Sequence, residues 1–477
     1  MESLSSRYRH IFEKYETIGQ EHVFRFWDSL TAHEKKRLLD QAEKIDVKVV
    51  DEFKVLIRGE NTALHYIPGT LKPFSVIRLP QSQEQYRAQA RALAAGEQVL
   101  SQGKVGAILV AGGQGTRLGF PGPKGTFPVG PITDRTLFQY HVEKVLALER
   151  RYARAIPLYI MTSRSNYAQT IAFFESKRYF GRNKALFVFF QQRELPPLDL
   201  SGKLILDQKG IISTSPDGHG GLLNGIRDFR LIDDMEKRGV EILFYFQVDN
   251  VMVRVCDPVF LGYHVMAYAE MSAKTVRKRN AFEKLGNIGT IGNKTVTIEY
   301  TELSDEEKCA QKDGRLLFEQ GSIAIHVFSR TFFKRLIDQA VELPFHLAHK
   351  KIAYIKTNGK RCKPRTENGI KFEQFIFDTV PYARTVTVME TDRDDFSPIK
   401  NKTKQDSPRT ARQALTNMFA SWLEECGVKI PKNKKGDVSV PIEISPLFAM
   451  NAGELRTKIN PGKVRRPFLF TPGTTRG

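Results

Sequence analysis

The sequence predicts an α/β protein with a central, mostly parallel mixed sheet and helices on both faces. From Val105 onward, short apolar segments alternate with helical segments of about 10 to 15 residues, the pattern of strands joined by crossover helices. The apolar run Leu243–Val248 lacks regular polar–apolar alternation, as expected when both faces of a strand are covered. Another apolar run, Ala107–Val110, leads into a glycine-rich segment, and α/β proteins bind phosphates at such strand ends.

A chain of 477 residues is too long for one ordinary core and suggests about two or three domains. We expect a helical N-terminal region over residues 1–100, the main α/β domain over 101–384, and a small C-terminal domain with short strands over 385–477. The predicted strands are Ala107–Val110, Pro157–Thr162, Ala185–Phe190, Glu241–Val248, Thr295–Tyr300 and Ala383–Glu390. The predicted helices are Gln83–Gln102, Leu137–Arg151, Ala168–Ser176, Ile226–Arg238, Pro258–Met271 and Pro408–Gly427.

Composition argues against several classes of protein. No apolar run reaches the roughly 18 residues of a membrane span, and the first residues lack the apolar stretch of a secretory signal. The 4 cysteines are widely separated, which predicts neither a zinc site nor a disulfide framework. We therefore expect a cytoplasmic protein with no membrane partner. The net charge of +20 is spread along the chain without a nucleic-acid-binding motif, so we expect phosphate-bearing substrates and no nucleic acid.

The most informative segment is the glycine-rich stretch from Val105 to Gly130. Glycines surround Arg117, and Lys124 stands between proline and glycine. Glycine permits positive φ and a close approach of ligand to backbone, so the segment predicts an anion-binding loop with two cations in its wall. Its spacing fits neither a P-loop nor a dinucleotide-binding fingerprint. A glycine-rich turn without a ligand is the alternative, and the two cations count against it.

Asp249 follows the apolar run at the predicted carboxyl edge of the sheet. A carboxylate at this edge can hold Mg²⁺ together with substrate phosphates and water. The alternative is an aspartate that caps a helix or stabilises a turn.

Gln192 follows another predicted strand, and a second glycine-rich turn, Ser215–Leu222, comes after it. Amide side chains and free backbone groups suit the edge of uracil, which carries both acceptors and a donor. Ordinary polar surface is the alternative here.

The loop sequence VAGGQGTRLGFPGPKG resembles the signature LAGGxGTRLGxxxPKG of the UDP-sugar pyrophosphorylases (UDPGP type 1). The similarity runs from about residue 100 to about residue 425 and is strongest to the eukaryotic-type UDP-N-acetylglucosamine pyrophosphorylases. It implies a Rossmann-like nucleotide-diphospho-sugar transferase fold, with residues 101–384 as the catalytic nucleotidyltransferase domain.

The resemblance also implies roles for individual residues. Arg117, Lys124 and Lys400 would be catalytic; Lys400 lies in FSPIKN, which is similar to the family's FSPLKN. Asp249 would hold Mg²⁺ as the cofactor beside the phosphates. The residues implied to bind the nucleotide are Val110, Ala111, Gly112, Gly113, Lys124, Gln192, Gly218 and Asp249.

Four residues match sugar-binding positions of the family. Gly286 and Glu299 lie in EKLGNIG and TIEYTE, which resemble the family's PVG turn and VVEYSE. The chain departs from the family at the other two, because His219 in PDGHGG and Ser322 in GSIAIH stand where the family has asparagine. The choice of sugar is therefore the part of the resemblance that these two residues affect.

The reaction implied is UTP + N-acetylglucosamine 1-phosphate → UDP-N-acetylglucosamine + diphosphate. A UTP–glucose-1-phosphate or broad-specificity UDP-sugar uridylyltransferase is the alternative, which His219 and Ser322 favour. More distant alternatives are a non-catalytic sugar-nucleotide sensor and a basic nucleic-acid-binding protein. The partners expected are UTP, a hexose 1-phosphate and diphosphate. The protein itself is expected to be a monomer or a weak homo-oligomer.

Overall fold

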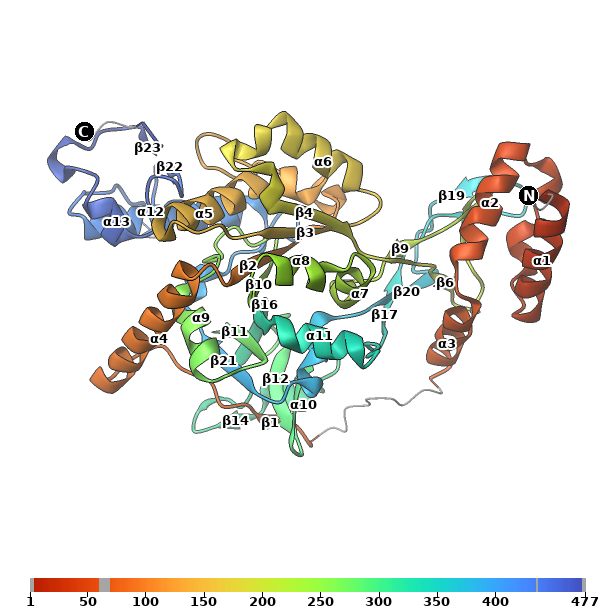
Figure 1. Cartoon of the computed structure of the whole chain (residues 1–477), viewed down its shortest axis with the longest axis horizontal. Helices are drawn as coiled ribbons and strands as arrows, with labels where there is room; N and C mark the ends of the chain where they lie inside the picture. Colours follow the sequence, from red (N-terminus) through yellow and green to blue (C-terminus); the bar gives the residue numbers. More distant parts are fainter. Residues whose placement is uncertain (1–3, 60–68, 435, 474–477) are drawn as a thin grey trace. The chain divides into compact units, whose positions relative to one another are not determined.

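The computed structural model describes residues 4–59, 69–434 and 436–473, and these form two compact units (Figure 1). The first unit contains the described parts of Met1–His65, Gln192–Asn224 and Glu342–Asp378. The second contains those of Tyr66–Gln191, Gly225–Val341 and Thr379–Gly477. Each unit is thus assembled from three separate stretches of the chain.

The second unit is built on a ten-stranded mixed sheet. Its parallel half consists of β10 (Ile242–Gln247), β2 (Val105–Val110), β3 (Leu158–Thr162) and β4 (Phe187–Gln191), in that order. Beyond β10, the antiparallel β16 (Gln320–Ser329) begins the other half. The remaining strands are β1 (Lys72–Pro73), β11 (Met271–Arg277), β12 (Asn287–Ile291), β13 (Lys294–Ile298) and β21 (Val386–Glu390).

Helices cover both faces of this sheet, as predicted. On one face, Phe244 and Phe246 of β10 belong to the same buried cluster as Phe138 of α5 (Leu137–Tyr152). That cluster also includes residues of α9 (Pro258–Met266) and α12 (Pro408–Glu425). On the other face, Tyr245 lies against Phe328, which packs against Phe333 of α11 (Arg330–Asp338). The predicted α/β class with a mixed sheet is confirmed.

The C-terminal segment shares the core of the sheet. β22 (Ile442–Ile444) and β23 (Phe468–Phe470) pair in parallel, and their apolar side chains lie in the same buried cluster as α5. The short helix α13 (Ala452–Arg456) lies between them in sequence. The predicted short C-terminal strands are therefore present.

The first unit combines helices with small sheets. Its helices are α1 (Leu4–Thr17), α2 (Ala32–Lys44) and α3 (Val47–Ile57). They pack on strands from the other two stretches: the ring of Phe53 on α3 stacks on Phe372 of β20 (Gly369–Glu373) with centroids 3.6 Å apart. The other strands are β5 (Glu194–Leu195), β6 (Leu198–Asp199), β7 (Leu206–Gln208), β8 (Ile211–Ile212), β9 (Ser215–Pro216), β17 (His346–Lys350), β18 (Tyr354–Ile355) and β19 (Arg361–Cys362).

Several predicted element boundaries were wrong. The predicted helix Ile226–Arg238 is two helices, α7 (Gly221–Asp228) and α8 (Leu231–Lys237), separated by Arg230 with φ of 51°. The predicted helix Pro258–Met271 ends at Met266, and Met271 instead begins β11. The predicted strand Ala185–Phe190 begins at Phe187, after a short 3-10 turn. Helices α4 (Gln83–Ser101) and α6 (Tyr167–Ser176) agree with prediction to within one residue at each end.

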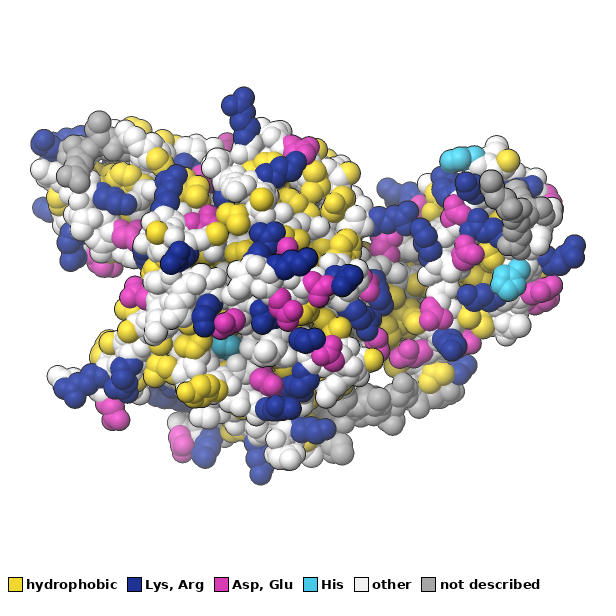
Figure 2. Space-filling model, viewed as in Figure 1, with side chains coloured by type: hydrophobic (Ala, Val, Ile, Leu, Met, Phe, Trp, Pro, Cys, Tyr) yellow, Lys and Arg dark blue, Asp and Glu magenta, His cyan; other side chains and the backbone are white. Residues whose placement is uncertain are grey.

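Positive charge on the visible face is dispersed, in keeping with its spread along the sequence (Figure 2). Lysine and arginine side chains are scattered over the visible face rather than gathered into a single patch (Figure 2). Among the described residues, no helix has the length and apolar character needed to span a bilayer.

Candidate active site

The glycine-rich segment forms a closed loop at the carboxyl end of β2. Its two arms are paired, because Gly115 donates its N–H to the carbonyl of Gly122 at 2.8 Å and Lys124 donates to that of Gly113 at 3.0 Å. At the tip, Gly119 adopts φ of 72°, a conformation that other residues rarely tolerate. The loop is therefore a defined structure held by its own backbone.

A buried asparagine ties this loop to the neighbouring strand end. The Asn166 side chain donates to the carbonyls of Ala111 at 2.8 Å and Gly113 at 3.3 Å. Within the described chain, the N–H groups of Gly112 and Gly113 form no hydrogen bond, so they can donate to a ligand. Nothing in the sequence pattern singled out Asn166, because its role depends on the pairing of β2 with β3.

The two cations of the loop differ in their surroundings. Arg117 is exposed and has no ion pair or hydrogen bond among the residues that the structure describes. Lys124 is largely buried, and its ammonium group lies 3.2 Å from Oδ2 of Asp249. At the next residue, a methyl group on Gly125 would lie 2.2 Å from the ring of Phe138, so only glycine fits there. The structure thus brings together Lys124 and Asp249, which the sequence separates widely.

Helix α5 holds the turn that carries Asp249. Burial lowers the pKa of His141 to about 3, so its neutral ring donates from Nε2 to the carbonyl of Val248 at 3.0 Å. One turn along the helix, Lys144 donates to the carbonyls of Val251 and Val253, and burial lowers its pKa to about 7. Sequence reasoning missed these two supports; the available signal was a pair of polar residues three positions apart on an otherwise apolar helical face.

Lys400 lies on a segment that is hydrogen-bonded to the turn that carries Asp249. Ile399 donates its N–H to the carbonyl of Asp249 at 3.0 Å, and Ser397 donates to the side chain of Asn250 at 3.1 Å. The Lys400 ammonium lies 5.8 Å from the ring centre of Phe396. This segment also brings the side chain of Lys402, another residue missed from the sequence, to within 3.5 Å of where a Cβ on Gly119 would stand.

Three of the predicted sugar-binding residues also come together in the second unit. Ser322 donates its N–H to the carbonyl of Gly286 at 2.8 Å. A Cβ placed on Gly286 would lie 3.8 Å from Oε1 of Glu299. All three are therefore neighbours: Gly286 directly precedes β12, Glu299 directly follows β13, and Ser322 lies on β16.

The other predicted residues, Gln192, Gly218 and His219, lie in the first unit. Gln192 donates its side-chain amide to the carbonyl of Gly218 at 2.9 Å. His219 accepts the N–H of Ile376 at Nδ1, at 3.1 Å, and its ring stacks on Phe375. Burial lowers the pKa of His219 to about 4, so the ring is neutral and its remaining proton lies on Nε2. His219 is thus a hydrogen-bond donor at that atom.

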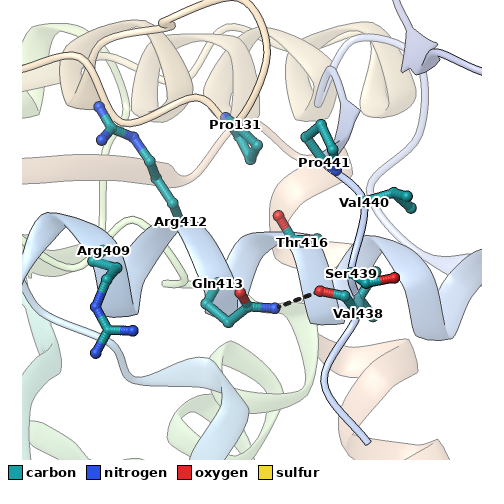
Figure 3. Close-up of a pocket in the computed structure, with 9 residues that line it drawn as sticks. All are labelled: Pro131, Arg409, Arg412, Gln413, Thr416, Val438, Ser439, Val440 and Pro441. Carbon is teal, nitrogen blue, oxygen red and sulfur yellow. Dashed lines mark hydrogen bonds between the residues drawn. The ribbon is translucent and has the colours of Figure 1, made fainter. Parts of the chain in front are cut away.

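A separate pocket lies between α12 and the segment 438–441 (Figure 3). Gln413 crosses it to donate to the carbonyl of Val438 at 3.2 Å. Arg412, also on this helix, donates to the carbonyl of Pro128 at 2.8 Å. None of the residues predicted to bind nucleotide or sugar lines this pocket, so it is distinct from the candidate site.

A glycine-rich loop with two cations, beside a carboxylate at the carboxyl edge of parallel strands, is suited to bind a nucleotide phosphate, and the family match makes this protein an α/β nucleotidyltransferase. The chain belongs to the family described as UTP–glucose-1-phosphate uridylyltransferase (UDPGP), whose model matches residues 74–449. The resemblance predicted from the loop sequence is confirmed.

Individual relatives are similar over nearly the full chain. A UDP-N-acetylglucosamine pyrophosphorylase of Saccharomyces cerevisiae is 38% identical over 445 residues, covering 88% of this chain and 92% of that protein. The UDP-N-acetylhexosamine pyrophosphorylase-like protein 1 of Homo sapiens is 34% identical, covering 95% of each. A crystal structure of the uridine diphosphate N-acetylglucosamine pyrophosphorylase from Trypanosoma brucei superposes with a TM-score of 0.78 at 25% identity, covering 95% of this chain and 94% of that one.

Proposed function

We propose that this enzyme transfers the uridylyl group of UTP to N-acetylglucosamine 1-phosphate, forming UDP-N-acetylglucosamine and diphosphate. One observation carries the proposal most strongly: Lys124, in a preformed anion-binding loop, lies 3.2 Å from a carboxylate at the end of the neighbouring parallel strand. Cationic groups and a candidate metal ligand thus lie close together at the carboxyl edge of the sheet, an arrangement that suits the phosphates of a nucleoside triphosphate. The names of relatives at 32–38% identity support the same reaction.

The chemistry requires positioning and charge stabilisation rather than a protein nucleophile. A phosphate oxygen of the sugar phosphate forms a bond to the α-phosphorus of UTP, and the bond from that phosphorus to the bridging oxygen breaks. Diphosphate leaves with the bonding electrons. Arg117 neutralises the departing diphosphate, Lys124 holds the α-phosphate, and Lys400 binds the phosphates from the segment beside Asp249.

The remaining predicted residues bind the uridine of UTP and the sugar of the sugar phosphate. The backbone of Val110–Gly113, with Gln192 and Gly218, holds the uridine. Gly286, Glu299 and Ser322, with His219, hold the sugar. Glu299 offers a carboxylate to sugar hydroxyls, and His219 offers an N–H donor at Nε2. A cytoplasmic location, a monomeric or weakly associating state and the absence of a nucleic-acid partner are proposed together with this function.

Asp249 is suited to hold Mg²⁺. Its Oδ2 contacts Lys124, whereas Oδ1 has no partner within the described residues. A single carboxylate oxygen fits this ion, which prefers one or two protein oxygens supplemented by phosphates and water. The bound ion would neutralise part of the phosphate charge in the transition state.

Replacing Asp249 with alanine is expected to raise the Mg²⁺ concentration needed for half-maximal turnover. The variant would lose a ligand oxygen, whereas substrate phosphates and water would remain to bind the ion. The measurement is diphosphate release against Mg²⁺ concentration, with Asp338→Ala as control, because Asp338 is exposed at the end of α11. Full activity of the wild-type enzyme in excess chelator would contradict the metal requirement.

The proposed function is tested by diphosphate release from UTP with a panel of sugar phosphates: the 1-phosphates of N-acetylglucosamine, N-acetylgalactosamine, glucose and galactose. We expect the highest kcat/KM with N-acetylglucosamine 1-phosphate. A glucose-specific or broad enzyme is the second candidate, favoured by His219 and Ser322 at the two departures from the family pattern. Equal or higher kcat/KM with glucose 1-phosphate would establish that candidate instead, and no turnover with any sugar phosphate would refute both.

A further inference from the structure

The first unit holds the Gln192 side chain in a single orientation. Strands β5 and β9 are antiparallel with Glu194 opposite Pro216, and this register brings Gln192 beside Asp217 and Gly218. The Gln192 amide nitrogen, Nε2, donates to Oδ1 of Asp217 at 3.1 Å and to the carbonyl of Gly218 at 2.9 Å. Both hydrogens of the amide group are thereby used.

The chemistry of these neighbours dictates which end of the amide faces them. A backbone carbonyl can only accept, and a carboxylate also accepts, so the nitrogen must point toward them and the oxygen away. Within the described part of the chain, Oε1 of Gln192 has no hydrogen-bond partner. The side chain therefore presents an acceptor, and no donor, to a ligand.

Asp217 is itself rigidly held. Its backbone N–H donates to Arg193 at 3.1 Å, and its carbonyl accepts from Gln374 at 2.7 Å. The carboxylate lies against Gly221, where an added Cβ would be 2.0 Å from Oδ1. The glycine at this position of PDGHGG therefore makes room for the Asp217 side chain.

Stability does not explain a carboxyl group in this position. Asp217 is only 1% exposed, and its second oxygen, Oδ2, is buried with no hydrogen-bond partner. Burying an unpaired polar atom costs free energy, so a functional role is the simpler account. Burial also raises the pKa of Asp217 to about 7, and Oδ1 remains an acceptor if a proton resides on Oδ2.

We propose that Asp217 is a positioning residue that, with the Gly218 carbonyl, locks the Gln192 amide so that its oxygen faces the base and selects uracil over cytosine. The proposal rests on the proposed function, in which Gln192 contacts the base. Uracil carries a donor at N3, which Oε1 can accept, whereas cytosine carries an acceptor at N3 and would face it unpaired. A site with buried polar groups rejects a ligand that leaves them unsatisfied.

The test is diphosphate release by the full-length enzyme with UTP, CTP and dUTP as alternative nucleotides, each at saturating sugar phosphate. Asp217→Leu has a similarly branched side chain but removes one of the two acceptors that hold the Gln192 nitrogen. Rotating the amide to offer an N–H to cytosine then breaks only the hydrogen bond to the Gly218 carbonyl. We expect the ratio of kcat/KM for UTP to that for CTP to fall by about tenfold or more. The ratio for UTP to dUTP, which depends on the ribose, should stay within about twofold of wild type.

Asp217→Asn is the matched control, because its side-chain oxygen can still accept from Gln192, and it should retain the wild-type UTP preference. Asp217→Ala adds no atoms and replaces Asp217→Leu if thermal unfolding shows that the leucine variant does not fold. An unchanged UTP-to-CTP ratio in a folded Leu or Ala variant overturns the role of Asp217 while leaving the proposed function intact. A wild-type enzyme that releases diphosphate from none of the three nucleotides overturns the proposed function, and the inference with it.

Discussion

Arg117→Ala should lower kcat by about 10²–10³-fold and leave the free energy of unfolding within about 0.5 kcal/mol of wild type. The guanidinium is exposed and forms no ion pair or hydrogen bond among the described residues, so its removal breaks no contact of the folded chain. Its charge is useful only when diphosphate is present. The loss should appear in kcat, measured by diphosphate release with saturating substrates.

Lys124→Ala provides a useful contrast to this variant. Its ammonium pairs with the largely buried Asp249, so the variant should lose activity to a similar degree and also leave that carboxylate unpaired. Lys104→Ala serves as the control, because Lys104 is a partly exposed residue of the same unit that pairs with Glu241 at 3.1 Å. Near-wild-type diphosphate release by either loop variant would show that the loop does not bind the reacting phosphates.

Glu443→Ala should destabilise the protein by about 3–5 kcal/mol, the usual cost of removing one partner of a buried ion pair. The carboxylate is fully buried on β22, where it pairs with Arg135 and accepts the N–H groups of Ile132 at 2.8 Å and Thr133 at 2.7 Å. Its loss leaves the Arg135 guanidinium with Glu143 as its remaining carboxylate partner. The measurement is the midpoint of denaturant unfolding, taken with the unfolding slope.

The surface pair of Glu424 and Lys432 supplies the control for Glu443. Glu424→Ala removes a partly exposed salt bridge from the same C-terminal segment and should cost at most about 1 kcal/mol. Burial opposes ionisation of Glu443, but the hydrogen bonds from Thr133, Ile132 and Arg135 prevail and lower its pKa. The stabilising contribution is therefore present at neutral pH and is lost as the pH falls through that lowered pKa. Equal destabilisation by the two variants would contradict this interpretation.

Local sequence patterns predicted much of the parallel half of the sheet. The apolar runs of β2, β3 and β10 are continuous because both faces are covered, and this property is visible in the sequence itself. β11 and β16 were not predicted, because no local periodicity distinguishes a buried strand from a buried helix end. The break at Arg230 was missed for a related reason, since the helical pattern continues across it.

The residues of the candidate site also fall into two groups, those that local sequence patterns identified and those that they did not. The loop glycines, Arg117 and Lys124 were identifiable because the required conformation and charge lie within one short segment. The residues that support the Asp249 turn were not identifiable in this way, because His141 and Lys144 form hydrogen bonds with backbone carbonyls more than a hundred positions away. Asn166 likewise reaches the loop only through the pairing of β2 with β3. Because hydrogen bonds to the backbone depend on where strands end in space, residue type alone does not reveal them.

By itself, the sequence determined the fold class and the family and predicted an anion-binding loop, because strand burial, glycine conformation and charge are properties of short segments. The tertiary structure decided which groups meet. It paired Lys124 with Asp249, bonded the Lys400 segment to the same turn, and placed Asp217 against the amide of Gln192. These contacts join residues from different strands and loops, so they exist only once the sheet register is established.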